Sequence, residues 1–231
     1  MESPPGSGVL VAGGTGALGA AVVRELSEAG YAVTATWIVD AERERVEAEM
    51  GDAVALVRAD LFDPEDAAAA VAGVDALAAV VNLVGGFAMG PKVGDAQLAD
   101  FERLLRLNLV PGFNLAHAAM PRLAERGGGA YVGVSARAAL RPFPGAAGYV
   151  TSKAAVLAFV QALDAEYRRE GVRCNAILPS TIDTPANRKA EPDADWSKWV
   201  PPEQIAKVVR FLVSDDSAPT SGAGVPVYGR A

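Results

Sequence analysis

Short apolar runs alternate with alanine-rich stretches of helical length along almost the whole chain. Strands separated by helices need crossover connections, which make neighbouring strands parallel and cover both faces of the sheet with helices. We therefore expect an α/β fold, a doubly wound and mostly parallel sheet, whose first helix spans residues 17–29 and ends at Gly30. The runs expected to be strands are Val9–Ala12, Ala32–Trp37, Val54–Val57, Leu77–Leu83, Ala130–Val134 and Val172–Leu178.

The absence of a long linker predicts a single domain over residues 1–231. Hydrophobic residues make up 51% of the chain, which is enough to build a core and excludes disorder as the main state. Residues 1–8 are polar and rich in proline and glycine, and we expect them to form a loose tail. They lack the basic and apolar regions of a signal peptide.

Charge and patterning exclude several partners. A net charge of -7 repels phosphate backbones, so we expect no nucleic acid. The longest uncharged stretch, residues 76–91, is interrupted by Asn82 and by glycines and is shorter than the roughly 20 apolar residues of a membrane span, so we expect no membrane. Cys174 has no second cysteine to pair with, and no Cys/His cluster predicts a metal. These features fit a cytoplasmic protein.

Three glycines follow the first expected strand in the spacing Gly14-x-Gly16-x-x-Gly19. A dinucleotide-binding fingerprint requires this position, between a strand and a helix. The first two glycines let the backbone approach a pyrophosphate, the helix N-terminus supplies N–H donors, and the third lets helix pack on sheet. The alternative is a glycine-rich turn without a ligand. We favour an NAD(P)-binding Rossmann fold because all three glycines have the required context.

Tyr149 and Lys153 are four residues apart, so a helix places them on one face. An ammonium beside a phenol stabilises the phenolate, and we expect it to lower the pKa of the tyrosine from about 10 toward neutrality. The alternative is a solvated lysine beside a half-buried tyrosine. We favour the proton-exchanging pair because the two residues follow both a glycine fingerprint and the fifth expected strand.

The combined motifs resemble the short-chain dehydrogenase/reductase family over nearly the whole chain. Residues 12–19 are similar to its cofactor loop, residues 81–85 to a degraded Asn-Asn-Ala-Gly strand end, and residues 175–184 to the segment that holds the nicotinamide. Asp60 corresponds to the adenine contact. The cofactor contacts that this resemblance implies are Gly13, Gly14, Thr15, Gly16, Ala17, Leu18, Gly19, Trp37, Asp60, Leu61, Asn82, Val84, Gly85, Lys153, Pro179, Ile182 and Thr184.

The resemblance also implies that Tyr149 and Lys153 are the catalytic pair and that Asn108 holds a water of the proton relay. The family's carbonyl-polarising serine lies thirteen residues before the tyrosine, where this chain has Ala136. Ser135, one position earlier, is the candidate substitute for this catalytic serine. The alternative for Ser135 is a strand-end residue that bonds its own loop.

The cofactor preference depends on the end of the second expected strand. An acid that binds the ribose diol of NAD is expected about 20 residues past the glycines, but this chain has Trp37 there and Asp40 three residues further on. Arg43 and Arg45 reach a 2′-phosphate if the following helix is favourably placed, so the sequence slightly favours NADP(H) over NAD(H). The alternative, which the interleaved glutamates favour, is a solvated helix face.

Residues 178–196 and the glycine loop resemble, more narrowly, the dihydropteridine reductase branch of the family, which also lacks the serine. That branch implies a flat heterocyclic or quinonoid substrate. The longest connection, residues 184–202, is expected to be a substrate-binding loop. Its tryptophans either close over a planar ring or anchor the loop on the domain. The residues expected to contact substrate are Ala136, Asn187, Arg188 and Trp196.

Two functions remain open at this point. One is an NAD(P)H-dependent reductase of a carbonyl, imine or quinonoid small molecule, with Tyr149 as the proton donor. The other is a catalytically silent NAD(P)-binding regulator, which the missing serine permits and the retained Tyr149, Lys153 and Asn108 oppose. The resemblance further implies a homodimer or homotetramer that pairs two long helices, residues 97–123 and 147–169.

Overall fold

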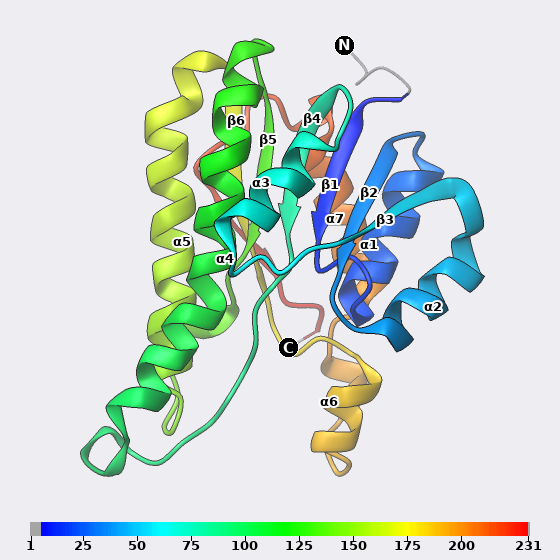
Figure 1. The fold of residues 1–231 in the computed structure, drawn as a ribbon. Helices are drawn as coiled ribbons and strands as arrows, with labels where there is room; N and C mark the ends of the chain where they lie inside the picture. The colour runs from blue at the N-terminus through cyan, green and yellow to red at the C-terminus, as the bar shows by residue number, and fades with distance from the viewer. Residues whose placement is uncertain (1–5, 231) are drawn as a thin grey trace.

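A computed structural model describes residues 6–230 of the chain, and residues 1–5 and 231 lie outside the described part. Its strands form one sheet in the order β3-β2-β1-β4-β5-β6-β7, and every strand pair is parallel (Figure 1). The expected α/β Rossmann fold is confirmed. The strands are β1 Gly8–Ala12, β2 Ala32–Trp37, β3 Val54–Arg58, β4 Leu77–Asn82, β5 Gly129–Val134, β6 Val172–Pro179 and β7 Gly224–Val227.

Two layers of helices cover the sheet (Figure 1). Helices α3 (Pro64–Ala72), α4 (Leu98–Glu125) and α5 (Ala147–Tyr167) pack on one face around a core that includes Leu10 and Val80. Helices α1 (Ala17–Glu28) and α7 (Pro202–Val213) pack on the other face around Val9 and Val11. Adjacent residues of β1 therefore enter opposite cores, because side chains alternate along a strand. The remaining helices are α2 (Asp40–Met50) and α6 (Pro185–Ala190).

The chain starts in the middle of the sheet, moves outward through β2 and β3, and then returns to form β4 on the other side of β1. Because of this reversal, the loop after β1 leads to a helix on one face of the sheet, and the loop after β4 leads to a helix on the other face. Ligands of open α/β sheets bind in the crevice at such a switch point, outside the carboxyl ends of the strands. The glycine loop after β1 and residues 83–86 after β4 lie at this place, where Leu83 N donates to Ala12 O at 3.0 Å.

The structure corrects one expectation at the start of the chain and adds one strand that the sequence did not predict. The expectation of a loose tail over residues 1–8 fails for its last part, because Gly8 belongs to β1 and the carbonyl of buried Ser7 accepts from Ala32 N at 3.1 Å. Residues 1–5 of the expected tail lie outside the described part. The edge strand β7 is the element that the sequence pattern did not predict. It has only four residues and contains Pro226, a residue that sheets tolerate mainly at an edge.

Among residues 6–230, every helix is too short or too polar to cross a lipid bilayer. The same residues contain no group of three or more histidine, cysteine or acidic side chains that is arranged to hold a metal ion.

Candidate active site

The glycine loop is tied to the end of β2. Gly13 N donates to Thr36 Oγ1 at 3.0 Å, and Gly14 N donates to Thr36 O at 3.1 Å. Gly13 has a φ of +72°, a left-handed conformation that side chains other than glycine rarely adopt. Thr15 is buried within the loop. The local sequence therefore forces the backbone to turn sharply between β1 and α1.

Gly16 and Gly19 have different roles in this loop. A Cβ added to Gly19 would lie 2.2 Å from Gly13 O, so Gly19 is required for the packing of α1 against the loop. A Cβ added to Gly16 would meet only Gly13 O, at 3.6 Å. Gly16 is the N-cap of α1 and supplies no side-chain hydrogen bond to the helix. The space above Gly16 and the N–H groups of the first turn therefore fit a pyrophosphate.

The other residues expected to contact a cofactor follow the same edge of the sheet. Ala17 is exposed and Leu18 half-buried at the start of α1, and Trp37 is the half-buried last residue of β2. Asp60, just after β3, is exposed and accepts from Phe62 N at 3.0 Å, whereas Leu61 is buried. These positions are contiguous along the carboxyl ends of β1, β2 and β3, as an extended dinucleotide requires.

The end of β4 brings together residues from three elements. Asn82 is buried and accepts from Val84 N at 3.1 Å, which holds the chain in a turn. A Cβ added to Gly85 would lie 2.5 Å from Asn108 Oδ1 and 3.0 Å from Lys153 Nζ. Residue 85 therefore has to be glycine for α4 and α5 to place these two polar groups against the backbone.

Tyr149 and Lys153 lie one turn apart in α5, as their spacing predicts. Lys153 is buried, and its Nζ donates to Val134 O, the last carbonyl of β5, at 3.0 Å. Tyr149 is half-buried, and the ring of Phe87 contacts it edge-on with a centroid separation of 4.9 Å. Lys153 forms none of the ion pairs found among the described residues.

The expected lowering of the pKa of Tyr149 is wrong for this structure. Burial raises the pKa of Tyr149 to about 12, and burial lowers the pKa of Lys153 from 10.5 to about 8. Both shifts have the same cause, since removal from water disfavours whichever form is charged. The lysine Nζ is directed to a strand-end carbonyl, and the phenol keeps its proton at neutral pH.

Asn108 joins α4 to α5 and to the loop after β4. Its Oδ1 accepts from Gly86 N at 2.9 Å, and its Nδ2 donates to Gly86 O, Leu104 O and Ser152 Oγ at 3.1, 3.2 and 2.9 Å. Ser152 in turn donates to Tyr149 O at 2.8 Å. The two amide hydrogens already face three protein oxygens, so the side chain braces the loop instead of presenting a free donor to water.

Ser135 adopts neither of the roles that we expected. It is buried, and its hydroxyl donates to Lys153 O at 2.7 Å, which ties the end of β5 to α5. Its partner is thus the backbone of the helix, not its own loop and not an open site. Ala136, at the position of the family's serine, is 5% exposed.

The segment after β6 approaches the site with most of its polar groups already paired. Pro179 ends β6, Ile182 pairs with Val200, and Thr184 is the N-cap of α6, where its Oγ1 accepts from Asn187 N at 3.2 Å. Asn187 Nδ2 also donates to Ile182 O at 2.8 Å. These hydrogen bonds make the first part of the expected substrate-binding loop a defined structure.

Arg188 and Trp196 interact within the same loop. Arg188 donates to both carboxylate oxygens of Asp183, at 2.5 and 2.7 Å, and its guanidinium lies 4.7 Å from the centroid of the Trp196 ring. Trp196 is half-buried, whereas Trp199 is 9% exposed and anchors the loop on the domain. Of the two alternatives for the tryptophans, anchoring therefore applies to Trp199.

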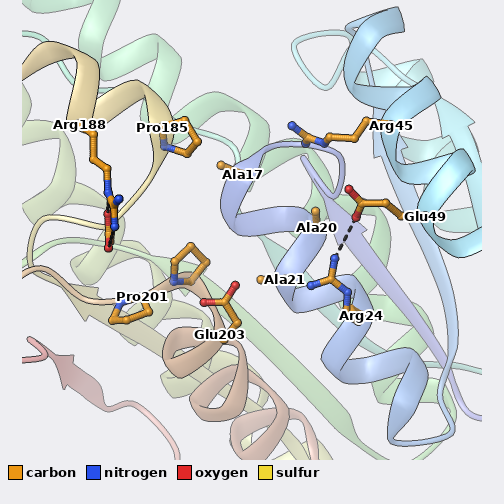
Figure 2. Close-up of a pocket in the computed structure, with 12 residues that line it drawn as sticks. Ala17, Ala20, Ala21, Arg24, Arg45, Glu49, Pro185, Arg188, Pro201 and Glu203 are labelled. Atoms are coloured by element: carbon orange, nitrogen blue, oxygen red, sulfur yellow. Dashed lines mark hydrogen bonds and ion pairs between the residues drawn. The ribbon is translucent and has the colours of Figure 1, made fainter.

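A pocket of about 410 Å³ lies between the start of α1 and helix α6 (Figure 2). One side is formed by Pro185 and Arg188 of α6, and the opposite side by Ala17 of α1 and Arg45 of α2. Arg45 donates to Thr15 O at 2.5 Å, which brings a cation to the cofactor loop. The start of α1 and helix α6 therefore face each other across an open space, and neither Tyr149 nor Lys153 is among the residues that line it.

A Lys153→Met variant tests the buried ammonium. Because the folded protein disfavours the charged form, the unfolded chain binds more protons between pH 8 and 10.5, so the wild type gains stability with rising pH in this window. We expect urea unfolding to show the wild type gaining up to about 3 kcal/mol relative to the variant between pH 7 and 10.5. Replacing Lys207, which is exposed on α7, should leave the wild-type profile. A constant difference between wild type and Lys153→Met would contradict the lowered pKa.

Sequence reasoning missed three contributors to this site. Ser152 lies three residues after Tyr149, within the segment from Tyr149 to Lys153. Its spacing therefore places it on the same helical face as Tyr149, and the sequence could have indicated its role. The Thr15–Arg45 hydrogen bond and the Phe87–Tyr149 contact join residues that are far apart along the chain. No local pattern indicates such contacts.

Comparison with known proteins agrees with this architecture. The family described as short chain dehydrogenase matches residues 7–195. A 4-formylbenzenesulfonate dehydrogenase of Comamonas testosteroni is 31% identical over 245 residues, covering 95% of each chain. A D-threitol dehydrogenase of Mycolicibacterium smegmatis is 30% identical and covers 97% of this chain and 92% of its own.

A solved structure of a short chain dehydrogenase/reductase family protein has the same fold. It is 30% identical, with a TM-score of 0.89 over 97% of this chain and 96% of the other. The family match, over residues 7–195, includes the glycine loop and the helix that carries Tyr149. The chain therefore belongs to the short-chain dehydrogenase/reductase family, NAD(P)-dependent oxidoreductases that interconvert alcohols and carbonyl compounds.

Proposed function

We propose that this protein uses NAD(P)H to reduce a small carbonyl compound, quinonoid compounds included, and that Tyr149 donates the proton. The observation that carries this proposal is the convergence of α4 and α5 on Gly85, where Asn108 Oδ1 and Lys153 Nζ lie so close that no side chain fits. This convergence is one helical turn from Tyr149 and lies at the carboxyl edge of the sheet, beside the glycine loop.

The chain offers a continuous set of contacts for the cofactor. The loop from Gly13 to Gly19 would hold the pyrophosphate, residues 82–85 and Lys153 the nicotinamide ribose, and residues 179–184 the nicotinamide. When bound, the reduced nicotinamide supplies a hydride and leaves the reaction oxidised. The open space above Gly16 supports this assignment, because a backbone without a side chain permits close approach of a phosphate.

Tyr149 is suited to act as an acid. Its pKa of about 12 keeps the hydroxyl protonated at neutral pH, although a raised pKa makes the phenol a weaker acid than it is in water. Proton transfer to the substrate oxygen therefore depends on the negative charge that this oxygen gains when the carbonyl accepts the hydride. Lys153, with a pKa of about 8, is mostly charged at pH 7 and can bind ribose hydroxyls while stabilising the phenolate that remains. Asn108 and Ser152 act as positioning residues that hold α5 against the loop after β4.

We propose a preference for NADPH. Arg43 lies over the ring of Trp37 at the end of β2, at 5.4 Å, where an acid would bind the NAD ribose diol. Arg45 donates to Thr15 O in the glycine loop, where Glu42 also accepts from Thr15 Oγ1 at 3.4 Å. Arg43 is partly neutralised by Glu47, at 2.5 Å. Arg45 is therefore the better candidate to bind a 2′-phosphate.

The substrate is proposed at the level of a class. Ala136 provides no hydroxyl to polarise a carbonyl, and Ser135 is occupied by Lys153 O, so a substrate that accepts hydride readily, such as a quinonoid or dihydropterin-like ring, suits this site. The names of the relatives refer to a formylbenzenesulfonate, a threitol and hydroxysteroids, which support alcohol and carbonyl chemistry without favouring one compound.

Cofactor titration and turnover assays test the proposed function together. We expect NADPH to bind more tightly than NADH in calorimetry, and the protein to oxidise NADPH when a quinone or a plain ketone is added. An Arg45→Ala variant should lose the preference for NADPH. Cofactor binding without turnover of any quinone, ketone or quinonoid dihydropterin would instead support the silent regulator, for which Ala136 is the favouring observation.

We also propose a homodimer or homotetramer that pairs α4 and α5. Phe113 on α4 is 54% exposed and lies 6.2 Å from the ring of Phe159 on α5, so the two helices present aromatic surface to water. Light scattering should give two or four times the monomer mass, and Phe113→Glu should shift the protein toward the monomer. Phe211→Glu on α7 is the control. A monomeric wild type at micromolar concentration would contradict the assembly.

A further inference from the structure

Two loop segments near Tyr149, residues 83–91 and 142–148, contain no charged residue, although Lys92 and Arg141 lie directly next to them in the chain. Residues 83–91 are Leu-Val-Gly-Gly-Phe-Ala-Met-Gly-Pro, and residues 142–148 are Pro-Phe-Pro-Gly-Ala-Ala-Gly. Neither segment has a side chain that donates a hydrogen bond, and the only side-chain acceptor is the weak thioether sulfur of Met89. Any ligand that lies against them is bound mainly by apolar contact and by the backbone.

Direct contacts hold the two loops side by side. Gly90 N donates to Gly145 O at 2.8 Å, and a Cβ added to Gly145 would lie 3.4 Å from Met89 Cε. Gly145 has a φ of +77°, and the same Cβ would approach Gly90 O to 2.8 Å, so glycine is needed for this close approach. The pairing is therefore built into the backbone.

Large apolar side chains project from these loops into water. Phe87 is 57% exposed, Met89 is 61% exposed and Phe143 is 41% exposed. We call these three residues the apolar mouth. Phe87 also contacts the Tyr149 ring edge-on, with an interplanar angle of 89°, so the apolar mouth begins at the proposed proton donor. Several large apolar side chains left in water at one place are typical of a binding surface.

We propose that the apolar mouth binds the ring of an uncharged aromatic or cyclic carbonyl substrate, and that Phe87 determines specificity by packing on that ring. The inference rests on the proposed function, since it names the substrate class of the same site. Phe87 is the ring closest to Tyr149, so a substrate ring that covers it brings its carbonyl to the phenol. Because these two segments have no side-chain hydrogen-bond donor and only a weak acceptor, we expect poor binding of charged or polyhydroxylated carbonyl compounds against them.

The experiment measures affinity separately from turnover, with acetophenone and acetone as ligands that share a methyl ketone and differ in the ring. With the NADP⁺-loaded protein, we expect acetophenone to bind at least about 10-fold more tightly than acetone in ligand-observed NMR titration. The charged analogue 4-acetylbenzoate should bind more weakly than acetophenone. Equal affinities for acetone and acetophenone would overturn the inference.

Variants then assign the preference to the apolar mouth. Phe87→Ala should reduce the affinity for acetophenone to near the affinity for acetone, and Phe87→Leu should retain part of the difference between the two ligands. Met89→Ala should also reduce this difference. Phe211→Ala, which removes an exposed phenylalanine from α7, is the matched control and should change nothing. An unchanged preference in Phe87→Ala would overturn the proposal.

Two further outcomes separate this inference from its alternatives. If Phe87→Ala and Met89→Ala change the mass of the protein in light scattering, a second copy of the chain covers the apolar mouth and the inference is wrong. If acetophenone binds in a Phe87-dependent manner but neither acetophenone nor any quinone, other ketone or quinonoid dihydropterin is reduced with NADPH or NADH, the proposed function fails, whereas the assignment of the ring-binding surface stands.

Discussion

A Gly16→Val variant is expected to remain folded and to lose NAD(P)H binding. The Cβ at this position meets only Gly13 O at 3.6 Å, and the φ of −63° at the N-cap suits any residue. The valine methyl groups would occupy the space through which the backbone approaches the pyrophosphate. Losing two charge-assisted hydrogen bonds of about 1.5–3 kcal/mol each would weaken binding at least about 100-fold. Calorimetry with NADPH and thermal unfolding of the ligand-free protein measure the two effects.

Gly19→Ala is the contrasting variant. Its Cβ would lie 2.2 Å from Gly13 O and 2.6 Å from the carbonyl carbon of Gly14, both backbone atoms that cannot move independently. This variant should therefore lower the melting temperature of the ligand-free protein, whereas Gly16→Val should not. Wild-type affinity for NADPH in Gly16→Val would show that the glycine loop does not contact a dinucleotide.

Tyr149→Phe is expected to reduce turnover of a plain ketone by about 10²–10⁴-fold, the usual cost of losing a positioned acid. The variant keeps the ring that Phe87 contacts, and removing the hydroxyl breaks none of the hydrogen bonds among the described residues. Stability and NADPH affinity should therefore stay near those of the wild type. Steady-state kinetics with NADPH and calorimetry separate the two readouts.

Lys153→Met is the matched variant for this test. It should weaken both cofactor binding and turnover, because in the proposed mechanism the same ammonium would bind the ribose and stabilise the phenolate. The comparison needs a plain ketone as well as a quinone, since a quinonoid acceptor takes hydride readily and can obtain its proton from water. Near-full turnover of the ketone by Tyr149→Phe would assign the proton donor to another group.

Local features of the sequence predicted most of the fold and the spacing of the residues proposed for the site. The strand β2 has the expected bounds, and α1 begins at Ala17 as expected, because each depends on side chains and a terminating glycine that are close in sequence. The spacing of Tyr149 and Lys153 likewise placed them one turn apart on α5. The β7 strand escaped prediction because four residues with a proline carry no periodic signal.

The tertiary structure decided the electrostatics and the contacts between distant residues. The pKa of Tyr149 rises because neighbouring elements exclude water from the phenol, and spacing along one helix cannot reveal this burial. The same holds for Ser135, whose hydroxyl is used by the backbone of α5, and for Phe87, which meets Tyr149 from a loop 62 residues earlier in the chain. Sequence alone determined which chemical groups are present and their local spacing, whereas packing between elements determined their protonation, their partners and the apolar surface around the phenol.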